Sequence, residues 1–78
     1  MNDFDLRKYK LTERENDVLK YVLKGYTNKQ IAQKLYISQD TAKAHVSSIL
    51  FKIGVGDRIG ILVKLFKKNI QDFINNME

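Results

Sequence analysis

The side chains best suited to chemistry in this sequence are hydrogen-bond donors on one predicted helix, about residues 39–53. Its apolar residues repeat at helical spacing, and the opposite strip carries Asp40, Lys43, Ala44 and Ser47. A lysine donates to guanine O6 and N7, a small alanine admits the helix and contacts a thymine methyl, and a serine reads bases weakly. Side chains of these kinds on the open side of a helix suit the major groove of double-stranded DNA, with DNA shape contributing to recognition. The alternative for Lys43 is an ordinary solvated lysine.

Beside this strip lie groups that suit phosphate oxygens. Thr27 and Ser38 stand where helix N-caps are expected, and the free N–H groups at a helix N-terminus bind anions. Capping alone explains these two residues as well as direct contact does, and the two roles can coexist. Phosphate contacts position a protein on DNA without reading its sequence. The residues predicted to make them are Thr27, Asn28, Lys29, Ser38, Gln39, Thr41 and His45.

The lone histidine does not suggest a metal centre or an active site. No second His, Cys or carboxylate stands at ligand spacing from His45, and the chain has no Cys. Nor does any nucleophile have a partner base. We therefore expect no enzyme, no metal, no cofactor and no small-molecule ligand. For His45 itself, a backbone carbonyl within the fold is the alternative partner to a phosphate.

Composition agrees with a polyanionic partner. The 78 residues carry a formal net charge of +5, with a sequence pI near 9.6. Between positions 27 and 52 the charged residues are four lysines and only one acid, Asp40. A lysine-rich composition that merely aids solubility is the alternative. Because the chain shows no signal segment and no apolar run of about 20 residues, we expect no membrane partner and a cytoplasmic location.

The elements that position these groups are predicted from caps and apolar periodicity. Thr12 with Glu15, and Thr27 with Gln30, form capping-box patterns. The expected helices run from Thr12 to about Lys24, from Thr27 to Leu35, over about 39–53, and from Asp57 to about Asn76. A break at Lys68–Asn69 is the alternative for the last helix. The predicted fold is all-α with four helices, comprising a flexible arm (1–10) and a helix-turn-helix domain (11–78).

The order of motifs resembles the LuxR/GerE-type helix-turn-helix domain of bacterial transcription regulators. The shared motifs are L-T-x-R-E at 11–15, G-x-[ST]-N-K at 25–29, I-A-x-x-L-x-I-S at 31–38, T-x-K-x-H-V at 41–46 and K-[IL]-G-V at 52–55, about three-fifths of the chain in all. Helical regions of sigma factors are the nearest alternative, but the His45-Val46 and Gly54-Val55 pairs favour LuxR/GerE. The resemblance implies a sequence-specific transcription regulator with base contacts at Lys43, Ala44 and Ser47. Because this sequence shows no sensor or receiver domain ahead of the motifs, we expect it to resemble the free-standing, GerE-like members.

Two positions depart from the family pattern. The family usually has a larger aliphatic residue at Ala42, so the core could be loose there. It usually has a Glu-like residue at Gly60, and a glycine should weaken the first turn of the last helix by about 1 kcal/mol relative to alanine.

The last helix carries more apolar surface than a three-helix core needs. Its main apolar arc includes Ile59, Leu62, Val63 and Phe66, whereas Ile61 and Leu65 fall off that arc. Because the family dimerises through this helix, we expect a homodimer. The residues predicted to form its interface are Ile61, Leu65, Ile70, Phe73 and Ile74. The alternatives are a tail folded back on the first helix, or an interaction module that contacts another regulator or RNA polymerase.

Overall fold

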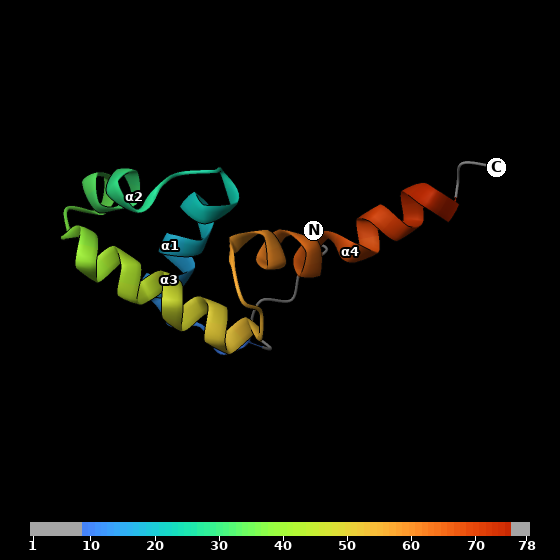
Figure 1. The fold of residues 1–78 in the computed structure, drawn as a ribbon, viewed down its shortest axis with the longest axis horizontal. Coiled ribbons are helices and arrows are strands. Elements are labelled where there is room, and N and C mark those ends of the chain that lie inside the picture. The colour runs from blue at the N-terminus through green and yellow to red at the C-terminus, as the bar shows by residue number, and fades with distance from the viewer. Residues whose placement is uncertain (1–8, 76–78) are drawn as a thin grey trace.

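The computed structural model describes residues 9–75 as backbone, and their side chains except those of 68–74. Four helices make up this part of the chain: α1 (Glu13–Leu23), α2 (Asn28–Leu35), α3 (Gln39–Ile53) and α4 (Arg58–Asn75). The fold is therefore all-α, as predicted from the sequence. Figure 1 shows α1, α2 and α3 gathered together, while α4 leads away from them.

Each of the first three helices begins at the N-cap that the sequence indicates. The Thr12 hydroxyl accepts from the Glu15 amide at 3.1 Å, and the Glu15 carboxylate accepts from the Thr12 amide at 2.8 Å. Thr27 and Gln30 repeat the same reciprocal pair with the same two distances. The Ser38 hydroxyl accepts from the amide of Thr41 at 3.0 Å. These local bonds satisfy amides that a helix leaves without internal partners, and so they fix where α1, α2 and α3 start.

Left-handed residues end or follow the same three helices. Gly25 after α1 and Gly54 at the end of α3 have φ near +86° and +87°, as expected for glycine at these positions. At the end of α2 the left-handed residue is Tyr36, with φ +57°. A bulky side chain is strained in this conformation. The sequence places Tyr36 in the turn but does not reveal that the turn needs a positive φ.

The core is formed where α3 crosses α1 and α2. Ile31, Ile49 and the small residue Ala42 have no solvent exposure. Ala32, on α2, is also buried. The buried apolar residues of the cluster are Val18, Leu19, Val22, Ile31, Ala32, Ala42, Val46, Ile49, Ile53, Ile61 and Leu65. Tyr9 packs against this cluster, whereas the preceding part of the predicted arm lies outside the described residues.

The prediction that Ile61 and Leu65 form a dimer interface is wrong. Ile61 is fully buried and Leu65 is 9% exposed, while Ile59 and Val63 of the predicted main arc are 69% and 54% exposed. Because α4 leads away from the other helices, few of its residues meet the core: Ile61 and Leu65 are buried in it, and Phe66 packs against it half-buried. Ile61 and Leu65 are therefore core residues of the single chain and are unavailable for an interface between two chains. The side chains of the other predicted interface residues, Ile70, Phe73 and Ile74, lie outside the described ones.

Two further expectations for α4 have opposite outcomes. The helix runs continuously through Asn69, and the Asp57 carboxylate accepts from the Gly60 amide at 2.8 Å, as expected of its cap. The expectation that alanine would suit position 60 better than glycine is wrong. A Cβ atom there would lie 2.9 Å from the Val55 Cβ, closer than real Cβ atoms come. Gly60 therefore allows the loop before α4 to approach the first turn.

Candidate nucleic-acid interface

The predicted reading strip lies on the open side of α3. Lys43, Ala44 and Ser47 are all exposed, and the buried residues of the same helix occupy its other side. Phe51 continues the exposed side one turn beyond Ser47 and is 86% exposed. The core therefore holds α3 from behind and leaves its outer surface accessible. Around this surface Lys29, Lys34 and Lys43 are exposed, with Asp40 as the only acidic residue between positions 27 and 52.

The N-terminus of α2 presents backbone donors beside the predicted phosphate residues. The Gln30 and Ile31 amides bond the Thr27 hydroxyl and carbonyl. Within the described part of the chain, the amides of Asn28 and Lys29 have no acceptor. The Lys29 side chain is exposed next to them, and the Asn28 side-chain oxygen accepts from Arg58. This end of α2 therefore has the donors that a phosphate group requires.

The N-terminus of α3 is arranged in a similar way. The Ser38 hydroxyl donates to the Thr41 hydroxyl oxygen at 2.9 Å, which leaves the Thr41 hydroxyl hydrogen available as a donor. Ser38, Gln39 and Thr41 are all exposed. Thr27 and Ser38 are thus confirmed as caps, while their contact with phosphate stays a prediction.

His45 is half-buried at the edge of the same surface. Among the described residues its ring makes no hydrogen bond, and its contact with a phosphate stays a prediction. No group of three or more His, Cys, Asp or Glu residues in the described part of the chain could hold a metal ion. In the same part, no helix combines the length and apolar character required to cross a membrane.

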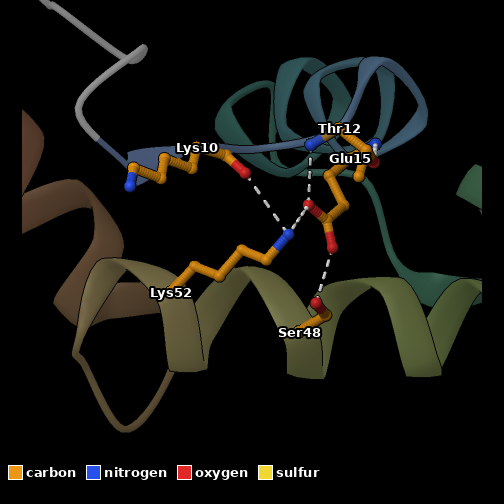
Figure 2. Close-up of polar contacts among 5 residues, drawn as sticks. All are labelled: Lys10, Thr12, Glu15, Ser48 and Lys52. Carbon is orange, nitrogen blue, oxygen red and sulfur yellow. Dashed lines mark hydrogen bonds and ion pairs between the residues drawn. The ribbon is translucent and has the colours of Figure 1, made fainter.

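A buried carboxylate ties α3 to α1 (Figure 2). Glu15 is 5% exposed, and its carboxylate accepts from the Ser48 hydroxyl at 2.5 Å and from the Lys52 ammonium at 2.7 Å. Lys52 also donates to the Lys10 carbonyl at 3.4 Å. Ser48 and Lys52 are one turn apart on α3, so the Glu15 carboxylate bonds to two successive turns of that helix. This contact fixes the angle at which α3 presents its outer surface.

The charge of Glu15 is stabilised by these partners. Burial alone would raise the pKa of the Glu15 carboxyl, but hydrogen bonds from Lys52, Ser48 and the Thr12 amide, together with the Lys52 charge, outweigh burial. They lower the pKa from 4.5 to about 2. Glu15 is therefore ionised at neutral pH in spite of its burial. The sequence indicated Glu15 only as part of a capping box. The i, i+4 spacing of Ser48 and Lys52 was the available signal for a shared partner, but it did not say which residue that was.

The four-helix fold is that of a DNA-binding domain of transcription regulators. The sequence matches the model of a family described as bacterial regulatory proteins of the luxR family over residues 9–65, and the chain belongs to that family. The resemblance identified from the motifs is thereby confirmed. No solved structure matches the chain significantly.

Several curated relatives are transcription regulators. An uncharacterized transcriptional regulatory protein, YhcZ of Bacillus subtilis, is 43% identical over 86% of this chain and 31% of its own length. The nitrate/nitrite response regulator protein homolog of Haemophilus influenzae is 42% identical over 76% of this chain and 28% of its own. Response regulator protein VraR of Staphylococcus aureus is 43% identical over 77% of this chain and 29% of its own. The chain thus spans less than a third of the length of each of these relatives.

Proposed function

We propose that the chain binds specific DNA sequences by inserting α3 into the major groove. The observation that carries this proposal is the exposed strip of Lys43, Ala44 and Ser47 on a helix whose other side is buried in the core. Lys43 supplies the strong donor for guanine, Ala44 permits close approach and contacts thymine methyl groups, and Ser47 reads weakly. Since this gives only one strong base contact, DNA shape contributes to the choice of site.

Phosphate contacts from the ends of α2 and α3 hold the recognition helix in register. The donors proposed for this role are the free amides at the α2 N-terminus and the side chains of Thr27, Asn28, Lys29, Ser38, Gln39, Thr41 and His45. The basic surface around them attracts duplex DNA of any sequence, so DNA affinity should fall steeply as the salt concentration rises. Support comes from the exposed lysines and from the membership of the chain in a family of DNA-binding regulators.

The proposed active form is a homodimer joined through α4. Ile59, Leu62 and Val63 are exposed on the first turns of that helix, with 69%, 39% and 54% of their surfaces accessible. Apolar side chains gathered in this way favour a protein partner. A two-fold dimer would place two copies of α3 in successive major grooves. Ile70, Phe73 and Ile74 remain part of the proposed interface, whereas Ile61 and Leu65 do not.

Two substitutions separate base reading from phosphate binding. Lys43→Ala should reduce the ratio of specific to random-sequence affinity by about 5- to 150-fold, because a lysine–guanine contact discriminates by about 1–3 kcal/mol. Lys29→Ala should weaken binding to all DNA sequences equally and reduce the slope of log affinity against log salt by about 1. Binding is measured by fluorescence anisotropy on sites selected from a random library. Unchanged site preference in Lys43→Ala would disprove the assignment of the strip, and sedimentation as a strict monomer at high concentration would disprove the dimer.

The exposed apolar side chains of α4 also favour a second candidate function. In that case α4 contacts another regulator or RNA polymerase, and DNA affinity is incidental. A gel shift at physiological salt distinguishes the two functions. The proposed regulator prefers some genomic fragments over random ones, whereas the interaction module binds all fragments equally weakly.

A further inference from the structure

Arg58, the first residue of α4, binds the start of α2 through both terminal nitrogens of its guanidinium. Its Nη1 donates to the Tyr26 carbonyl at 2.6 Å, and its Nη2 donates to the Asn28 side-chain oxygen. These partners stand 32 and 30 residues earlier in the chain. They flank Thr27, the N-cap of α2, so one side chain of α4 holds the residues on both sides of that cap.

This contact determines what Asn28 offers to a ligand. A side-chain amide has one acceptor oxygen and one donor nitrogen, and Arg58 occupies the oxygen. With that oxygen directed at Arg58, the Asn28 nitrogen is turned away from Arg58 and can donate to a phosphate oxygen. Without Arg58, the amide of Asn28 could rotate and present its oxygen to the phosphate instead. A planar guanidinium makes two such bonds at once in a fixed geometry, which a lysine cannot do.

We propose that Arg58 is a positioning residue for DNA binding. It orients Asn28 as a phosphate donor and fixes the N-terminus of α2 relative to α4. The contact thereby connects the helix proposed to join two chains with the helix end proposed to hold the DNA backbone. This inference rests on the proposed DNA-binding function, but it can fail while that function stands.

The test is a double-mutant cycle on the full chain with fluorescein-labelled random-sequence duplex DNA at fixed low salt. Random sequence suffices because phosphate contacts do not depend on base identity. Arg58→Ala and Asn28→Ala should each weaken binding about ten- to hundredfold, the usual effect of losing one hydrogen bond to a charged group. If Arg58 acts through Asn28, the double variant should bind about as well as the weaker single variant. Circular dichroism at the assay temperature establishes that each variant is folded.

Arg58→Lys separates geometry from charge. This variant retains the positive charge but loses the paired hydrogen bonds to Tyr26 and Asn28, so it should bind DNA as weakly as Arg58→Ala. Arg14→Ala is the matched control, because Arg14 is exposed on α1. This substitution removes the same charge as Arg58→Ala but at a different place on the chain. Its affinity should stay within about twofold of that of the unmodified chain.

Three results would overturn the inference. Full affinity in Arg58→Lys would mean that only charge matters, and independent effects that multiply in the double variant would mean that Arg58 does not act through Asn28. Unchanged affinity in Arg58→Ala, with normal binding by the unmodified chain, would refute the positioning role and leave the proposed function intact. If the unmodified chain itself fails to bind duplex DNA, the proposed function fails, and this inference fails with it.

Discussion

Replacement of Glu15 by glutamine tests the buried contact that fixes α3 against α1. The change keeps the shape of the side chain but removes the charge that faces Lys52. A pKa lowered from 4.5 to about 2 corresponds to roughly 3 kcal/mol of stabilisation of the ionised form. Because the Lys52 side chain is 30% exposed, water screens part of this interaction. We therefore expect Glu15→Gln to lower the free energy of unfolding by about 1–2 kcal/mol at pH 7.

The pH dependence of this difference gives the sharper test. The pKa of Glu15 is lower in the folded state than in the unfolded state, so the folded state binds fewer protons. The contribution of Glu15 is thus fully present above pH 4.5 and is lost as the pH falls from 4.5 toward 2. Urea unfolding followed by far-UV circular dichroism should show the difference between the unmodified chain and Glu15→Gln shrinking over this range. At pH 7 the melting temperature should fall by roughly 5–15 °C.

Glu13→Gln is the matched control, because Glu13 is an exposed carboxylate in the same first turn of α1. Its effect should stay within about 0.5 kcal/mol at every pH, as for most surface substitutions. Two results would refute the reasoning. One is a Glu15→Gln variant as stable as the unmodified chain at pH 7, and the other is a loss of stability that is the same at pH 7 and pH 2.5.

Two predictions concern the backbone at Gly60 and at Tyr36, the residue with a left-handed conformation. Gly60→Ala should destabilise the chain by about 1–3 kcal/mol, because its Cβ would lie 2.9 Å from the Val55 Cβ; a gain in the urea midpoint would contradict this. At position 36, glycine should be more stable than alanine by about 1 kcal/mol, because only glycine relieves the left-handed strain. Tyr36 is 95% exposed, so both replacements lose equally little packing, and equal urea midpoints would disprove the strain.

Local chemistry made the helix boundaries predictable. The bonds of Thr12, Thr27 and Ser38 join residues three apart, and such bonds depend only on neighbouring residue types. The end of α1 at Gly25 and the end of α3 at Gly54 follow for the same reason. The position of the reading strip was also predictable, because an apolar stripe on a helix of known bounds fixes what lies opposite.

The contacts between helices were not predictable in this way. Glu15 meets Ser48 and Lys52 at separations of 33 and 37 residues, and Arg58 meets Asn28 at a separation of 30. In the sequence, the capping box fully accounts for Glu15, and Arg58 is indistinguishable from an arginine exposed to solvent. Only the crossing geometry of the helices brings these groups together, and one sequence does not specify that geometry.

The faces of α4 show how apolar periodicity can mislead. Because Ile61 and Leu65 fall off the main apolar arc, the sequence favours an interface role for them, although periodicity shows only that an apolar face exists and not what covers it. In the fold, the narrower stripe of Ile61 and Leu65 serves the core, and the broader face with Ile59 and Val63 is exposed. A helix whose larger apolar face stays open after its own chain has folded retains surface for a second protein. The error in assigning the faces thus moves the proposed dimer interface to the other side of α4 and strengthens the reason for expecting a partner there.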